Sequence, residues 1–171
     1  MVKTAAIILV IVSSTMIGFL FANRFGQRVK ELRIIYSALK YLETEIIYGL
    51  TPIPIAFETI GSRIEKPIGE IFIQMSQALR PSDVTTAQVW LAAWRKSHGI
   101  LSLRARDYDI LYQLGHTLGQ TDKENQMKHI NMALTYLQSE EADARNDQQK
   151  HEKMYKYLGF LTGMMIVILM I

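Results

Sequence analysis

The sequence predicts an all-α protein of about six helices, in which long first and last helices continue into membrane anchors. Three observations support this prediction. Apolar residues recur at helical spacing through most of the 171-residue chain, prolines and glycines are few, and both ends of the chain are long apolar runs. We expect an anchor over 1–23, a cytoplasmic helical domain over 24–156, folded as a bundle or a superhelix, and a short anchor over 157–171.

The amino-terminal anchor is predicted from a run without charge. From Thr4 to Asn23 the sequence TAAIILVIVSSTMIGFLFAN contains no charged residue. A helix of roughly 20 residues reaches ~30 Å, the thickness of the hydrocarbon core of a bilayer. A cleaved signal peptide is the alternative. It is disfavoured because Lys3 is the single basic side chain before the run, and neither Gly18 nor Ala22 has a small residue two positions earlier.

The carboxyl-terminal run YLGFLTGMMIVILMI, residues 157–171, also lacks charge. It reaches only ~22 Å as a helix, which is short for a span. Lys153 and Lys156 could reach outward to the headgroups, and Tyr155 and Tyr157 could lie at the interface. The alternative, a terminal helix buried in a soluble core, is disfavoured because MMIVILMI has no polar face.

Basic residues gather at the inner ends of both apolar runs, whereas outside them lie only Lys3 and the amino terminus. The positive-inside rule therefore places 24–156 in the cytoplasm. We expect contact with anionic lipid headgroups from Arg24, Arg28, Lys30, Arg33, Lys153 and Lys156. This juxtamembrane charge accounts for most of the sequence pI of about 9.1, so nucleic acid is not an expected partner.

The first helix is expected to continue past Arg24 to Gly49, because one apolar stripe recurs at steps of three and four. Four shorter helices follow: from Pro52, from Pro67, from the loop PSDVTT (81–86) to His98-Gly99, and from near Ser102 to Leu118. The last helix begins near Asp122 and turns polar over 138–153. The predicted buried faces contain Leu32, Ile35, Leu39, Leu42 and Ile46; Ala56, Phe57, Ile60 and Ile64; Ile68, Ile71, Phe72, Met75 and Leu79; Ala87, Trp90, Leu91 and Trp94; Ile110, Leu111, Leu114 and Leu118; and Met127, Ile130, Leu134 and Leu137.

The stretch LGHTLGQTDKENQMKHI, residues 114–130, contains the residue types of a metal or catalytic site. Their spacing, however, is that of a turn between two helices. Gly119 lies where a glycine in left-handed conformation ends a helix. Thr121 and Glu124 have the spacing of a capping box, and Asp122 falls in the first turn of the next helix, where the helix dipole favours negative charge.

A metal site in the same stretch is disfavoured. His116 and His129 lie 13 positions apart across the turn, with no His or carboxylate four residues on to complete a ligand pair. The chain has no cysteine and no phosphate loop or catalytic triad motif. We therefore predict neither an enzyme nor a cofactor.

Small residues line one face of each predicted anchor. Ser14, Gly18 and Ala22 recur every four positions in the first, and Gly159 and Gly163 form a GxxxG in the second. Small residues allow close approach of helices in lipid, so we expect the two anchors to pack on each other. The alternative is that one face contacts another membrane subunit.

Several segments together resemble a known family: LETEIIYGLTPIPIAF (42–57), LGHTLGQTDKENQMKHINMAL (114–134), a polar helix, and LGFLTG (158–163). The chain resembles, over essentially its full length, the stage III sporulation protein AB family of endospore-forming bacteria. The pattern LG-x-x-LG-x-x-D-x-x-x-Q is its most specific part.

The resemblance implies a membrane component of the channel that connects mother cell and forespore, needed for spore development. It would lie in the mother-cell membrane around the forespore, with its helical domain in the mother-cell cytoplasm. The family is likened to the platform proteins of type II secretion and type IV pilus machines. Its partners would be a cytoplasmic hexameric ATPase and other membrane channel subunits. Secretion platforms usually carry two helical domains and this chain has one, so the likeness is functional more than geometric.

Two other functions remain open. A membrane-anchored regulator or ligand sensor would need a cavity lined by a few convergent polar groups, which the sequence does not indicate. A membrane-bound enzyme would need a catalytic constellation, and none is found.

Overall fold

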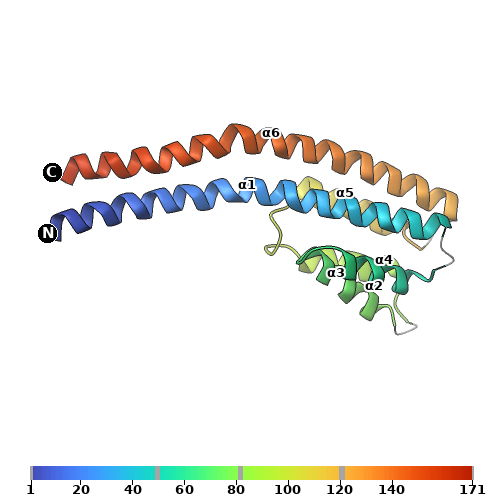
Figure 1. Ribbon diagram of the computed structural model, residues 1–171. Coiled ribbons are helices and arrows are strands. Elements are labelled where there is room, and N and C mark those ends of the chain that lie inside the picture. The colour runs from blue at the N-terminus through green and yellow to red at the C-terminus, as the bar shows by residue number, and fades with distance from the viewer. Residues whose placement is uncertain (1, 49–50, 81–82, 120–121, 171) are drawn as a thin grey trace. The chain divides into compact units, whose positions relative to one another are not determined.

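The computed structural model of the chain consists of helices throughout (Figure 1). It describes residues 2–48, 51–80, 83–119 and 122–170, with side chains described mainly over 25–46, 51–80, 83–119 and 124–151. The helices are α1 (Val2–Tyr48), α2 (Ile53–Arg63), α3 (Ile68–Ala78), α4 (Thr86–Lys96), α5 (Ala105–Thr117) and α6 (Lys123–Met170). These residues include no strand, so the predicted all-α class with about six helices is confirmed.

The first and last helices are the longest, as the sequence predicts. α1 continues without a break past Arg24, and α6 continues through the polar stretch 138–153. Among the residues that the structure describes, no helix combines the length and the apolar character that a membrane crossing requires. The anchors over 1–23 and 157–171 therefore stay predictions.

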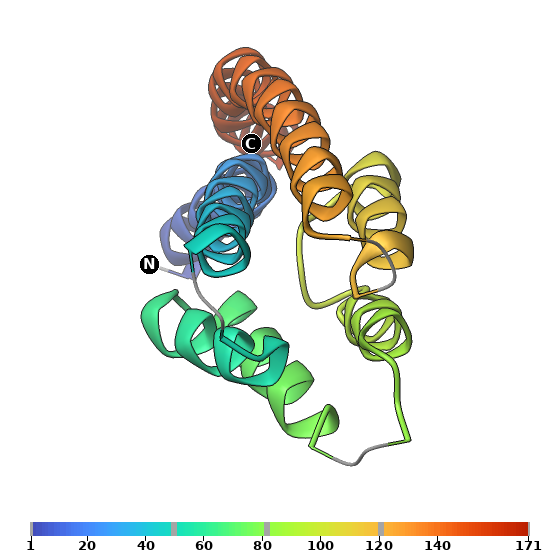
Figure 2. The ribbon, with the colours of Figure 1, turned by 90° about the vertical axis from the view of Figure 1, so that its right-hand side faces the viewer.

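The chain divides into two compact units. The larger comprises residues 30–141 and contains α2 to α5 with the adjoining parts of α1 and α6. Within it α2 packs on α3, α3 on α4 and α4 on α5, so the short helices follow one another in sequence order (Figure 2). The smaller unit comprises 1–29 and 142–171, and in it the rings of Phe25 and His151 stack with centroids 5.4 Å apart.

The apolar faces of the larger unit agree closely with the predicted stripes. All predicted core residues of α3 except Leu79 are buried, and so are the first four of α1. Five predicted core residues in other helices are only half-buried: Ile46, Ile64, Leu91, Ile110 and Met127. These five lie at helix ends or beside the buried stripe, where a shift of one position along a helix moves a side chain toward solvent.

The core of the larger unit is an aromatic cluster that joins α2, α3 and α4. Phe57, Phe72, Trp90 and Trp94 are all fully buried. The ring of Trp90 contacts each of the other three, with centroid distances of 5.9 Å to Phe57, 5.9 Å to Phe72 and 5.8 Å to Trp94. Tilted and edge-to-face pairs at such distances add to the stabilisation that burial alone provides.

Trp90 also fixes the position of α5. Its Nε1–H donates to the carbonyl of Leu111 across 2.7 Å, which satisfies a polar group that would otherwise be buried without a partner. One turn later the ring lies against Gly115, where a Cβ would overlap the indole. The close approach of α4 and α5 therefore requires a glycine at position 115.

The ends of α2 and the start of α5 differ from the sequence expectation. Pro52 is the N-cap of α2 rather than a residue of its first turn, and Ile64 is extended and ends that helix. α5 begins at Ala105 rather than near Ser102.

Two buried carboxylates explain where α5 begins. Glu31 Oε2 accepts a hydrogen bond from the Ser102 N–H, and Asp107 Oδ2 accepts one from the Arg104 N–H, each across 2.7 Å. These acceptors hold the backbone of 102–104 outside the helix. Glu31 is 5% exposed. Burial raises the pKa of Glu31 above its ordinary value, the Ser102 bond opposes this rise, and the charge of Asp107 adds to it.

Gly115→Ala should destabilise the full chain by ~1–3 kcal/mol, because the added methyl overpacks the buried Trp90 ring. Chemical unfolding followed by circular dichroism measures this loss. The matched control is Gly26→Ala, where the added Cβ would meet the end of the Gln148 side chain, which can move aside. Alanine favours a helix over glycine, so the control should lose no stability. Equal stability of Gly115→Ala and the parent chain would contradict the packing.

Glu31→Gln should change how stability depends on pH. Because the pKa of Glu31 is raised in the folded state, its contribution to stability is present below its ordinary value of 4.5 and is lost as pH rises through the raised pKa. The glutamine keeps an acceptor for Ser102 without the charge. Its unfolding free energy, relative to that of the parent, should therefore increase as pH rises through this window.

The matched variant Glu31→Ala separates the hydrogen bond from the charge. It removes the acceptor, so it should destabilise the chain by ~1–3 kcal/mol across the same pH range. A difference between Glu31→Gln and the parent that does not vary with pH would refute the role given to burial.

Candidate functional site

The turn after α5 is built around Gly119. α5 ends at Thr117, the Leu118 N–H donates to the Leu114 carbonyl across 3.2 Å, and Gly119 has φ of +75°. This is the left-handed conformation expected of a glycine that follows a helix. A Cβ at 119 would lie 3.2 Å from Oγ1 of Thr86, so the turn packs against the start of α4.

The start of α6 lies one position later than the sequence predicts. α6 begins at Lys123, so Asp122 precedes the helix instead of lying in its first turn, where Glu124 is found. The Asp122 carbonyl accepts from the Gln126 N–H across 3.0 Å, and its Oδ1 accepts from the Asn125 amide across 2.5 Å. Thr121 lies outside the described residues, and with it half of the predicted capping box.

The two histidines of the stretch lie on different elements. His116 is exposed in the last turn of α5, and His129 is half-buried in α6. Over the described ranges, no group of three histidine, aspartate or glutamate side chains is arranged to hold a metal ion.

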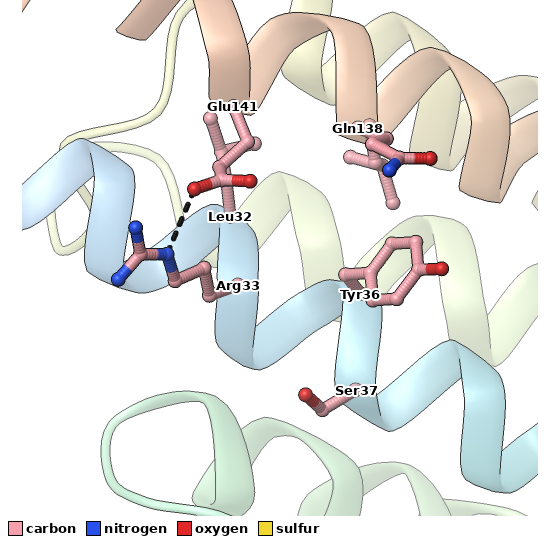
Figure 3. A pocket seen from close by; sticks show the side chains of 7 residues that line it. Leu32, Arg33, Tyr36, Ser37, Gln138 and Glu141 are labelled. Atoms are coloured by element: carbon pink, nitrogen blue, oxygen red, sulfur yellow. Dashed lines mark hydrogen bonds and ion pairs between the residues drawn. The ribbon is translucent and has the colours of Figure 1, made fainter. Parts of the chain in front are cut away.

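A small hollow between α1 and α6 is lined by charged, polar and apolar side chains (Figure 3). Its volume is about 270 Å³. At one end Arg33 Nε donates to Glu141 Oε1 across 2.8 Å, and Tyr36 and Gln138 lie toward the other end. Tyr36, Ser37 and Gln138 could not be recognised from the sequence, because α1 and α6, which bring them together, are about a hundred residues apart in the chain.

The predicted headgroup-binding residues have different surroundings. Arg28 is only 4% exposed, so its side chain is not available to lipid and that expectation is corrected. Lys30 is exposed and its Nζ lies 2.6 Å from Oε2 of Glu65, while Arg33 forms the ion pair with Glu141 described above. The structure does not describe the side chains of Arg24, Lys153 and Lys156.

The predicted packing residues of the anchors lie within α1 and α6. They are Ser14, Gly18 and Ala22 in α1, and Gly159 and Gly163 in α6, and the surroundings of their side chains are outside the description. The nearest described contacts in the same unit are the Phe25–His151 stack and the approach of Gly26 to Gln148. These contacts place the two chain segments side by side at residues 25–26 and 148–151.

Comparison with known proteins gives one consistent result. A sequence profile of the family described as stage III sporulation protein AB matches residues 3–171. The stage III sporulation protein AB of Bacillus subtilis (strain 168) is 36% identical over 170 residues, which is 99% of each chain.

A solved structure of a stage III sporulation protein AB (SpoIIIAB) has the same fold as this chain. The two align with a TM-score of 0.69 at 35% identity, over 72% of this chain and 98% of that one. The family profile, the Bacillus subtilis relative and the solved structure all agree with the resemblance seen in residues 42–57 and 114–134. The chain belongs to the stage III sporulation protein AB family.

Proposed function

We propose that the protein is a non-enzymatic membrane scaffold of the channel between mother cell and forespore. Its helical domain links a cytoplasmic hexameric ATPase to other membrane subunits of this secretion-like complex. The observation that carries the proposal is the family match over residues 3–171. A match of this extent includes both predicted anchors as well as the helical domain.

The interior of the larger unit supports a scaffold rather than an enzyme. Its centre is filled by packed rings, and the buried carboxylates of Glu31 and Asp107 accept hydrogen bonds from the backbone before α5. These bonds set the start of α5 and engage both carboxylates as acceptors for the backbone. A general acid or base must instead lie within reach of a bound substrate.

A ligand-sensing domain is the weaker alternative. The hollow at Arg33 combines an ion pair with a tyrosine and an amide, as sites for small polar ligands do. Its volume of about 270 Å³ is below the ~300–1,000 Å³ of most ligand pockets, and it is open to solvent. This size favours a scaffold that contacts protein partners.

The proposal includes a location and an orientation. The basic residues that follow the first predicted anchor and precede the second favour a domain in the mother-cell cytoplasm, next to anionic headgroups. The domain is then on the side where a cytoplasmic ATPase can reach it. Arg24, Lys153 and Lys156 are the side chains proposed to contact lipid.

A reporter inserted in the loop at residues 81–86 should test the orientation. A fluorescent protein that folds only in the cytoplasm should be active there, because the positive charge retains this loop on the cytoplasmic side. A phosphatase that is active only after export, inserted at the same position, should be inactive. The opposite pair of results would overturn the orientation.

Affinity purification of the full chain from sporulating cells should recover the hexameric ATPase. A scaffold binds its ATPase stoichiometrically, so mass spectrometry of the eluate should show both proteins in a reproducible ratio. The matched control is a strain that expresses the same chain without the affinity tag, whose eluate should contain neither protein. Recovery of the chain with a bound small molecule and no other subunit would favour the ligand-sensing alternative.

A further inference from the structure

A continuous groove runs along the junction of α3 and α4. It consists of a larger hollow of about 420 Å³, which extends to Val84, and a smaller one of about 100 Å³, which extends to Ile100. Gln74, Ala93 and Lys96 line both hollows, so the two form a single groove. All of it belongs to the larger unit.

The surface of the groove is mainly apolar. Met75 and Val89 lie buried beneath it, and Ala78 and Ala92 are exposed along its length. At its two ends Val84 is 39% exposed and Ile100 is 64% exposed, among the exposed large apolar side chains of the unit. Contiguous exposed apolar surface of this kind marks sites of interaction in soluble domains.

The groove has the dimensions that a helix requires. α3 and α4 each have 11 residues, so each extends over ~16 Å, about three helical turns. The small side chains of Ala78, Ala92 and Ala93 permit close approach of a third helix. An extended peptide would leave backbone groups without partners here, because the lining is largely apolar, whereas a helix satisfies its own backbone.

The charge of the groove indicates what an occupant must carry. Lys96 lines both hollows, and none of the ion pairs between described residues includes it. Its neighbour Glu70 is already paired, with Oε1 2.6 Å from Nζ of Lys66. A carboxylate on the occupant would therefore complement Lys96.

We propose that the α3–α4 groove docks an amphipathic helix of a protein partner, which places its apolar face in the groove and an acidic side chain against Lys96. The proposal deepens the proposed function, since it names a surface by which the scaffold binds one of its protein partners. Apolar burial along the groove supplies affinity, and the pair with Lys96 selects the partner and its register.

Two designed helical peptides of about three turns serve as probes. Both carry the same leucine and alanine face, and they differ in one residue, glutamate or lysine, at the position that meets Lys96. Binding to the full chain in amphipol is measured by fluorescence anisotropy. The glutamate peptide should bind about tenfold more tightly than the lysine peptide, since unlike charges attract and like charges repel at the same place.

Four variants of the full chain test the site itself. Lys96→Glu should invert the preference between the two peptides, and its matched control Lys128→Glu, at an exposed lysine of α6, should not. Ala92→Trp fills the groove and should weaken binding of both peptides about tenfold. The matched control Ala142→Trp, at an exposed alanine outside the groove, should leave binding unchanged. Equal binding of both peptides by the parent, or no effect of Lys96→Glu and Ala92→Trp, overturns the proposal.

The purified hexameric ATPase gives a separate measurement. Loss of its binding in Ala92→Trp and Lys96→Glu, but not in the control variants, would identify it as the partner that docks in the groove. An ATPase that does not bind even the parent chain would contradict the proposed function, while the peptide measurements still decide the role of the groove. Self-association of the parent chain that these two variants abolish would identify a second copy as the occupant and overturn the proposal.

Discussion

The larger unit depends on the position of one indole ring. Trp90 packs on rings from α2 and α3, lies beside Trp94 in its own helix, and donates a hydrogen bond to Leu111 in α5. Four helices therefore meet at one side chain, and Gly115 provides the space that the ring occupies. The α3–α4 groove lies on the outer side of two of these helices, so the same packing gives the proposed docking surface a rigid base.

The helices could be predicted from the sequence because their apolar periodicity is local. The stripe of α1 and the glycine after α5 need no knowledge of distant residues. The start of α5 was placed too early, because one of the two carboxylates that set it is Glu31, which is 71 positions from Ser102. The role of Gly115 was missed for the same reason: the indole that requires it lies in the preceding helix. A sequence can indicate a capping residue that lies within three positions of a helix end. It cannot indicate a hydrogen-bond acceptor that a distant helix supplies.

For the functional residues too, the sequence alone did not indicate which side chains are buried and which are exposed. The charge pattern predicted lipid contact for Arg28, yet the side chain is buried, because sequence alone does not distinguish a solvated cation from an enclosed one. The exposed alanines of the groove, Ala78 and Ala92, gave no sequence signal, because alanine on a helix is equally compatible with the core and with the surface. Family membership was recognisable from the LG-x-x-LG pattern, whose two glycines have separate structural causes: contact with Trp90 at 115 and a left-handed turn at 119.

The aromatic core also gives the protein an intrinsic optical signal. The sequence contains two tryptophans, both fully buried, with ring centroids 5.8 Å apart. Their environments differ, since the Trp90 indole N–H is hydrogen-bonded and that of Trp94 has no such partner among the described residues. The indole emission of the whole chain therefore originates at one place in the fold. Without any label, this emission reports how α2 to α5 pack, because neither predicted anchor contains a tryptophan.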